Sequence, residues 1–144
     1  MTKVVFEEYD FRFKEDKGQK QIFDPVRKKY VVLTPEEWVR QHILQYLLAK
    51  SYPASLIAIE RGIDVNGASK RFDIVVYGRD SEPLILVECK AQDEPLAQNV
   101  LMQILGYNLS VKAKYFWITN GLHNYFIRLS DGKVMEEVPG MLVT

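Results

Sequence analysis

KRFDIVVY at residues 70–77 is one of two stretches from which the fold of this chain is predicted. The other is LILVECK at residues 84–90. Each is a short apolar run, which is typical of a buried strand. The second run ends in Glu88 and Lys90, so these charged residues are expected at the end of a buried strand, at the edge of the sheet. If the two strands pair as a hairpin, Asp73 of the first comes close to Glu88 of the second.

The charged residues of these strands are placed by strand periodicity. Glu88 and Lys90 are two positions apart and project to one face, while Cys89 points to the other. Asp73 lies in an apolar run, where an isolated carboxylate would be costly to bury. Two neighbouring carboxylates repel each other unless a cation or a proton lies between them. The pattern therefore predicts a divalent-metal site.

An acidic residue two positions before a lysine is a weak signal by itself. The chain contains three such patterns, at residues 15–17, 88–90 and 131–133. The first lies in a charged turn signal and the last in an Asp-Gly turn, where solvated charges are expected. Only the pattern at 88–90 follows four consecutive aliphatic residues, which singles it out.

The chemistry of the predicted site follows from its oxygen donors. The carboxylates of Asp73 and Glu88, with the backbone carbonyl of Cys89, form a hard donor set that suits Mg²⁺ or Mn²⁺. A bound cation of this kind polarises a phosphoryl oxygen and lowers the pKa of a water. Lys90 would orient that water or stabilise charge on the phosphate. The alternative is a structural ion pair between Asp73 and Lys90 at a sheet end, with Glu88 solvated.

Two helices are expected to support the site. Thr34 and Pro35 start the first, with Glu37 at the capping-box position and Arg40 and Gln41 nearby. A second helix is predicted from about residue 94 to 110. It places Gln103 and Tyr107 on one face, where they would hold the lysine or contact a phosphate. The alternative is that Tyr107 is a core residue and Gln103 is solvated.

The remaining elements complete a mixed α/β domain. Strands are expected at 4–6, 11–13, 21–23 and 30–33 in a β-rich N-terminal part. A further strand is expected at 56–61, another at 115–119, and a final hairpin at 125–129 and 134–138. We therefore expect residues 1–144 to form one domain, with a β-rich extension at 1–33 and a core at about 34–130.

Composition excludes several classes of protein. The chain has 144 residues, no net charge and a single cysteine. These features argue against a strongly basic nucleic-acid coat protein and against a disulfide framework. No apolar run is long enough to cross a membrane and no GxxxxGK[ST] stretch is present, so we expect a cytoplasmic protein without a nucleotide-driven motor.

Several separated segments, taken in order, give a more specific signal than any one of them. Together they resemble the N-terminal nuclease domain of type I restriction enzyme R subunits, in the small form found as short bacterial proteins. The resemblance covers about residues 20–130. The segments are IFDPVRKKY at 22–30, LTPEEWVRQ at 33–41, KRFDIVVY at 70–77, VECKA at 87–91, QILGY at 103–107 and TNG at 119–121.

The resemblance implies the fold and chemistry of the PD-(D/E)xK superfamily. That fold is a restriction-endonuclease-like mixed sheet flanked by helices, here with an N-terminal β-hairpin extension, and the activity is Mg²⁺-dependent DNA cleavage. Position by position, Asp73 and Glu88 match the metal-binding acids and Lys90 the catalytic lysine. The other matches are Glu37 with the acid of the first helix, and Gln103 with Tyr107 for the Gln-x-x-x-Tyr motif.

This chain departs from the family pattern in two respects. Phe72 stands where the superfamily name has proline, and the helicase and assembly regions of a full R subunit are not part of these 144 residues. We therefore expect a Mg²⁺-dependent endonuclease whose partners are DNA and either other restriction-system subunits or further copies of itself, with no membrane. The alternatives are a non-catalytic module that keeps the fold to bind nucleic acid or protein, and a DNA-repair or mobile-element nuclease.

Overall fold

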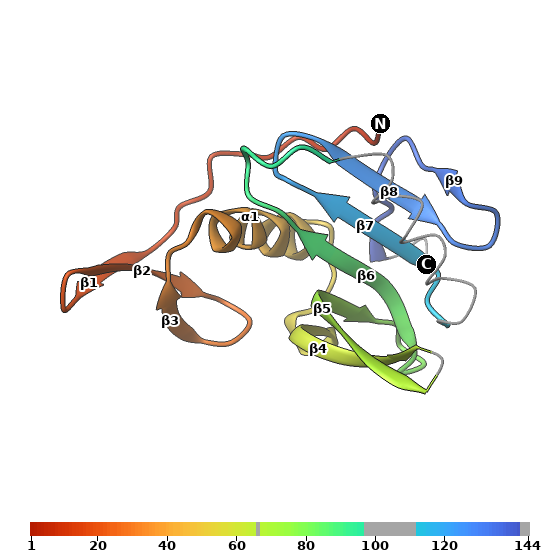
Figure 1. The fold of residues 1–144 in the computed structure, drawn as a ribbon, viewed down its shortest axis with the longest axis horizontal. Helices are drawn as coiled ribbons and strands as arrows, with labels where there is room; N and C mark the ends of the chain where they lie inside the picture. Colours follow the sequence, from red (N-terminus) through yellow and green to blue (C-terminus); the bar gives the residue numbers. More distant parts are fainter. Residues whose placement is uncertain (66, 97–111, 142–144) are drawn as a thin grey trace.

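The computed structural model describes residues 1–65, 67–96 and 112–141, which form a mixed six-stranded sheet, one α-helix and a small N-terminal sheet (Figure 1). The six strands lie in the order β4-β5-β6-β7-β8-β9, and every neighbouring pair is antiparallel except the parallel pair β6 and β7. The strands are β4 (Ile57–Val65), β5 (Ala68–Tyr77), β6 (Pro83–Cys89), β7 (Tyr115–Thr119), β8 (Asn124–Arg128) and β9 (Lys133–Val134). The expectation of a mixed α/β sheet is confirmed.

The expected N-terminal β-hairpin extension is present, as a separate three-stranded antiparallel sheet. It lies beside α1 (Pro35–Ala49), at the left of Figure 1, and a short 3-10 turn η1 (Ala54–Leu56) leads from α1 into β4. Its strands are β1 (Phe13–Asp16), β2 (Gln19–Asp24) and β3 (Lys29–Val32).

The predicted hairpin of residues 71–77 and 84–90 is present as β5 and β6. Ile74 lies opposite Val87, so the same register, continued by one residue, brings Asp73 opposite Glu88. At the end of β6 the backbone N–H of Lys90 donates to the carbonyl of Thr119, at 2.8 Å, and so ties this end of β6 to β7.

The six-stranded sheet separates two apolar clusters. One lies between the sheet and α1, and includes Ile74, Val87 and Trp117. Alternate residues of the same strands, such as Val75 and Leu86, belong to a cluster on the opposite face. Burial of each such side chain contributes about 1.5–3 kcal/mol, so the alternation holds the central strands in register.

Helix α1 begins as the sequence predicts. The Thr34 hydroxyl accepts a hydrogen bond from the backbone N–H of Glu37, at 3.0 Å, and Pro35 occupies the first helical position. The helix ends at Ala49 with Lys50 as its C-cap, and Ser51 then adopts a left-handed conformation with φ of 73°. No helix in the described part of the chain is long and apolar enough to cross a membrane.

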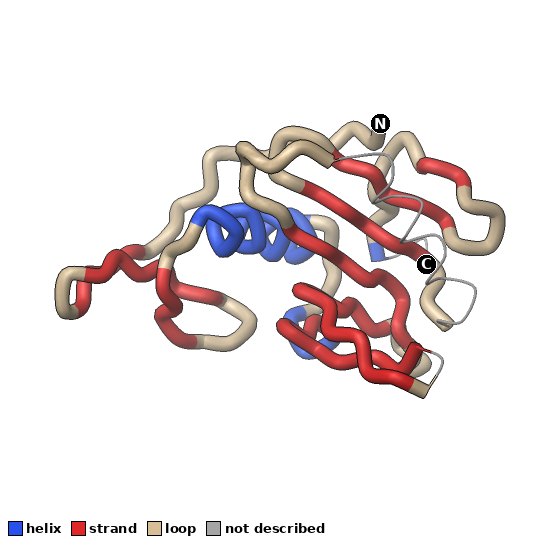
Figure 2. The backbone as a smooth tube through the Cα atoms, viewed as in Figure 1, coloured by secondary structure: helices blue, strands red, loops and turns tan. Residues whose placement is uncertain are grey.

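Several predicted boundaries are wrong. Residues 4–6 are not a strand: the chain runs as a loop from its anchor at Thr2 beside β8 toward β1 (Figure 2). Phe6 packs edge-on against Tyr46 of α1. β1 starts only at Phe13, and β9 ends at Val134 instead of Val138. Residues 94–96 are not helical, and the rest of the predicted second helix lies outside the described residues.

Candidate functional site

Asp73 is held at the end of β6 by a backbone group. The backbone N–H of Cys89 donates to Asp73 Oδ2 at 2.7 Å. Cys89 stands between Glu88 and Lys90, so this bond seats the Asp73 carboxylate against the backbone that joins these two residues. The Cys89 side chain is buried in the cluster beneath α1.

Asp73 occupies a point where the strand turns over. In a regular strand residues two apart share a face, yet Ile74 packs beneath α1 while Phe72 packs on the opposite face. The β4–β5 ladder pairs Ile59 with Ile74 and Arg61 with Phe72, and skips Glu60 and Asp73 between them. Because of this irregularity in β5, the Asp73 side chain is 25% exposed although it lies within an apolar run.

Glu60 is the residue of β4 that lies opposite Asp73 at this irregularity, and its backbone has a left-handed φ of 53°. Such a conformation is unfavourable for a residue with a Cβ. The Glu60 carboxylate accepts hydrogen bonds from Arg71 and, at 3.5 Å, from Arg40 Nη2 of α1. Nothing in the sequence indicated this role for Glu60.

Lys90 lies beside Asp73 but does not neutralise it by direct contact, and Glu88 is a second carboxylate that pairs elsewhere. Glu88 Oε1 lies 3.2 Å from Lys70 Nζ. Within the described residues, Lys90 Nζ forms no ion pair or hydrogen bond, so the structural Asp73–Lys90 ion pair considered above is not found there. The nearest cation to Asp73 in those residues is Arg40, with Nη1 3.9 Å from Oδ1.

The electrostatic surroundings leave Asp73 poorly compensated. Burial is the largest cause that raises the pKa of the Asp73 carboxyl, and the neighbouring charge of Glu88 raises it further. The Cys89 N–H, Arg40 and Lys90 act in the opposite direction without cancelling these effects. A cation between Asp73 and Glu88 would offset both the burial of the Asp73 charge and its repulsion from Glu88.

Glu37 lies in a very different environment. Its two oxygens accept four hydrogen bonds, from Arg27, twice from Arg40, and from Gln41, at 2.8–3.1 Å. Burial alone would raise the pKa of Glu37, but the hydrogen bonds and charge of Arg40, helped by Gln41 and Arg27, lower it to about 2. Glu37 is therefore fully engaged in holding α1 rather than open to a ligand.

This network reaches the N-terminal sheet through Asp24. Asp24 is fully buried and accepts hydrogen bonds from Arg27 Nε at 2.8 Å and from Gln41 Nε2 at 3.0 Å. Runs of basic residues such as 27–29 are usually solvated, but Arg27 instead bonds Asp24 and Glu37. The opposite charges of Asp24 and Arg27, three residues apart around Pro25, were the available signal. Gln41 Oε1 is buried and has no hydrogen-bond partner among the described residues.

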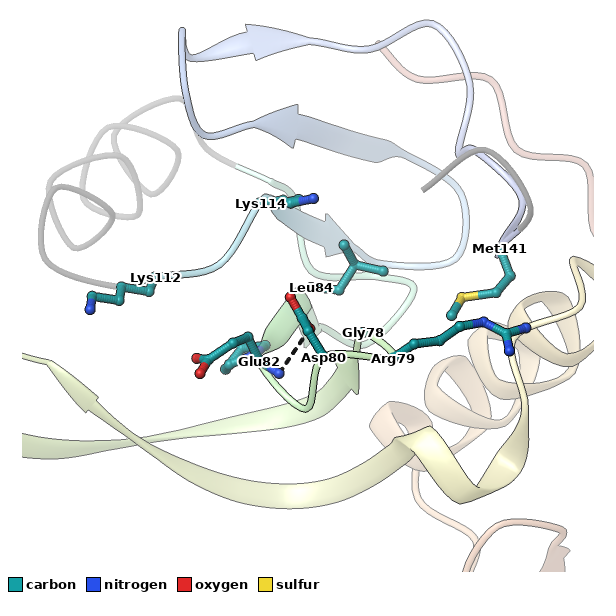
Figure 3. A pocket seen from close by; sticks show the side chains of 9 residues that line it. Gly78, Arg79, Asp80, Glu82, Leu84, Lys112, Lys114 and Met141 are labelled. Atoms are coloured by element: carbon teal, nitrogen blue, oxygen red, sulfur yellow. Dashed lines mark hydrogen bonds between the residues drawn. The ribbon is translucent and has the colours of Figure 1, made fainter.

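An open groove of about 650 Å³ runs between β3, the start of α1 and β4, and reaches the residue after Lys90. It borders the Asp73 region through Arg40, Glu60 and Ala91. A second pocket, of about 520 Å³, lies at the turn between β5 and β6, with Lys112 and Lys114 on one side and residues 78–82 on the other (Figure 3). This turn is at the far end of β6 from Glu88, so the pocket is separate from the candidate site.

The residues present fit a hard divalent cation. Asp73 and Glu88 supply carboxylate oxygens, and the Cys89 carbonyl supplies a neutral oxygen from the same stretch of β6. No three His, Cys, Asp or Glu side chains gather as a metal cluster among the described residues, so this donor set would consist of two side chains and one backbone oxygen. Gln103 and Tyr107 lie outside the described residues.

The fold is similar to one solved structure of this class. A fragment described as an HsdR subunit of a type I restriction enzyme from Vibrio vulnificus YJ016 superposes with a TM-score of 0.50 over 76% of this chain, at 20% sequence identity. This chain spans 24% of that fragment. At this identity the likeness concerns the fold alone.

The sequence comparison then identifies the family. The profile of the type I restriction enzyme R protein N terminus (HSDR_N) matches residues 35–140, and the chain belongs to this family. The match includes α1 and the six-stranded sheet, and β1, β2 and β3 precede it. Comparison with curated proteins gave no match.

Proposed function

We propose that this chain is a Mg²⁺-dependent endodeoxyribonuclease whose reaction centre consists of Asp73, Glu88, the Cys89 carbonyl and Lys90. The observation that supports it most directly is the seat of the Asp73 carboxylate on the Cys89 N–H, between Glu88 and Lys90. Membership of the type I restriction enzyme R protein N-terminal family makes DNA the expected substrate.

Each residue has a distinct task in this proposal. The carboxylates of Asp73 and Glu88 and the Cys89 carbonyl would hold Mg²⁺ or Mn²⁺. When bound, such an ion supplies Lewis-acid stabilisation of the phosphate and lowers the pKa of a water. Lys90, with an ammonium group unpaired within the described residues, is available to orient the attacking water or to stabilise charge on the scissile phosphate.

Arg40 would act as a positioning residue. It bonds Glu37 through Nε and Nη2 and approaches Asp73 through Nη1 at 3.9 Å. Burial alone would lower the pKa of Arg40, but Glu37 and, to a smaller extent, Asp73 raise it, so it stays a cation. It thereby limits the repulsion at Asp73 without occupying the carboxylate.

The expected activity of the isolated chain is weak nicking with little sequence preference. A neutral chain has little long-range attraction for the phosphate backbone, and a single metal site cuts one strand at a time. Other restriction-system subunits, or further copies of the chain, would present DNA to the site.

Cleavage of supercoiled plasmid by the purified chain, with Mg²⁺, Mn²⁺ or EDTA, tests the proposal. The wild type should nick the plasmid only with a divalent ion, and Asp73→Asn and Lys90→Ala should each lose at least about 100-fold in rate, as expected for groups acting in the transition state. Asp64→Asn and Lys112→Ala alter exposed residues and should retain activity. Metal-independent nicking, or full activity of Lys90→Ala, would refute the proposed centre.

A further inference from the structure

The N-terminal sheet has two dissimilar faces. Its inner face packs on α1: Ile22 is fully buried, Phe13 stacks on Trp38 at 6.3 Å, and Asp24 bonds Gln41. Residues alternate between faces along a strand, so Phe23 and Tyr30, which lie opposite each other in β2 and β3, belong to the outer face.

The outer face presents two cations held on aromatic rings. The guanidinium carbon of Arg12 lies 4.0 Å from the centroid of Phe23, and Lys14 Nζ lies 4.7 Å from that of Tyr30. The two rings contact each other edge to face at 5.3 Å, so the four side chains form one continuous row. Both basic residues are exposed, and within this row no carboxylate neutralises them.

Charge is distributed unevenly between this sheet and the rest of the chain. Residues 11–33 contain seven Lys and Arg against three Asp and Glu. The rest of the chain contains 12 Lys and Arg against 16 Asp and Glu, so the zero net charge conceals a basic segment at residues 11–33, which holds the N-terminal sheet. Asp24, one of the three acids, is itself buried and paired with Arg27.

The N-terminal sheet borders the same groove as the candidate site, through the end of β3. β3 contributes Val31 and Val32 to the groove wall, and the groove continues past Arg40 and Glu60 to Ala91. A polyanion lying in this groove would therefore pass the Asp73 region at one end and the N-terminal sheet at the other. The sheet precedes the region matched by the family profile, residues 35–140.

From this arrangement we infer that the outer face of β1, β2 and β3 binds the phosphodiester backbone of duplex DNA, through Arg12 and Lys14. This inference deepens the proposed nuclease function and rests on it for the identity of the polyanion. Arg12 covers one side of the Phe23 ring and Lys14 one side of the Tyr30 ring. The outer surface of the sheet therefore offers positive charge rather than open rings for base stacking. A guanidinium held against a ring loses little freedom when it binds a phosphate.

The test is binding of the full chain to a short fluorescent duplex in EDTA, where no cleavage is expected, across a range of salt. Arg12→Gln/Lys14→Gln removes two cations and should lower the salt slope of log K by about 1.8, since each phosphate contact contributes about 0.9. Between about 50 and 200 mM salt, the wild type should then lose roughly tenfold more affinity than this variant.

The matched control is Arg79→Gln/Lys133→Gln, which removes the same charge from exposed positions outside the N-terminal sheet. It should bind with the wild-type salt slope, and both variants should melt cooperatively near the wild-type temperature. An unchanged slope in Arg12→Gln/Lys14→Gln, or an equal loss in the control, would overturn the inference and leave the basic face to an acidic protein partner.

The two proposals can fail separately. A wild-type chain that binds DNA through Arg12 and Lys14 but never cleaves it would refute the nuclease proposal alone. Metal-dependent cleavage that requires Asp73, together with DNA binding indifferent to Arg12 and Lys14, would refute the inference about the sheet alone.

Discussion

Two groups of charged residues meet at Arg40 and differ in how well their carboxylates are satisfied. Around Glu37, four N–H donors occupy both oxygens, and the pKa falls to about 2. Around Asp73, one backbone N–H binds the carboxylate, its nearest described cation stands 3.9 Å away, and the pKa rises. Both residues are acidic and largely removed from solvent, so the number of hydrogen-bond donors around each carboxylate explains why their pKa values shift in opposite directions.

The comparison separates a structural role from a functional one. A buried carboxylate with all its hydrogen bonds stabilises the native state and gains nothing from a ligand. A buried carboxylate beside a second one, with few donors, is destabilising until a cation arrives. Glu37, which the family resemblance matches to the acid of the first helix, is saturated with donors and holds Arg40 by two of them.

The largest expected effect is on stability at Glu37. Glu37→Ala leaves Arg40 and Arg27 with unpaired buried donors and should reduce the free energy of unfolding by about 3 kcal/mol, near the lower end of the range for breaking a buried pair. The lower end applies because Arg27 retains Asp24, and Arg40 retains Glu60 at 3.5 Å. Urea denaturation at neutral pH measures this change.

The neighbouring acid provides the control for that measurement. Glu36 is exposed and lies next to Glu37 on α1, so Glu36→Ala should change stability by no more than about 0.5 kcal/mol. Equal losses in the two variants would show that the Glu37 network has no special structural weight.

The next effect is acid sensitivity. The folded-state pKa of Glu37 lies below its unfolded value of 4.5, so folding favours the ionised form. Its contribution is complete above about pH 4.5 and is lost as pH falls toward 2, a decrease of about 3 kcal/mol over the whole range. Glu37→Gln should therefore flatten the dependence of unfolding free energy on pH below 4.5.

Asp131 offers a comparison at a solvated position. Its pKa is also lowered to about 2, chiefly by hydrogen bonds from Arg128, but the pair is exposed on the surface. Solvent screens such pairs, so Asp131→Asn should leave the acid sensitivity nearly unchanged. If Asp131→Asn flattened the pH dependence of the unfolding free energy as much as Glu37→Gln, Glu37 would not be the source of the acid sensitivity.

Patterns local in sequence predicted most of the fold. Thr34 and Pro35 marked the start of α1 because capping involves neighbouring residues, and apolar runs marked β5, β6 and β7 because their burial is continuous. The failures have non-local causes. Residues 4–6 have strand-like composition, but Phe6 packs on α1 and no strand lies beside them.

The candidate site was predictable to a similar extent. Strand pairing brought Asp73 and Glu88 together because their distance depends on a single hairpin register. Tertiary placement decided the rest: Glu60 joins through a left-handed turn in β4, and Asp24 reaches Gln41 across 17 positions. No periodicity in the sequence encodes contacts of this kind.

A moderate effect is expected when a metal ion binds. Mg²⁺ at tenfold excess over its dissociation constant should raise the free energy of unfolding by about 1.4 kcal/mol, which is a few degrees in melting temperature. Asp73→Asn should abolish this shift, while Asp64→Asn should retain it, because Asp64 is an exposed acid outside the proposed donor set. Thermal melting with and without Mg²⁺ checks the expectation, and an equal response from both variants would exclude Asp73 as a ligand.

The smallest expected effect is a gain in metal-free stability on Asp73→Asn. The folded-state pKa of Asp73 is raised, so ionised Asp73 weakens the native state at neutral pH, and protonation relieves this as pH falls through that pKa. Asparagine removes the repulsion from Glu88 and still accepts from the Cys89 N–H, so the gain should be about 0.5–1 kcal/mol at pH 7. Arg40 would remain paired with Glu37. Urea denaturation in EDTA decides the point: a loss comparable to that of Glu37→Ala would mean that Asp73 is part of the same structural network, and the contrast between the two groups would disappear.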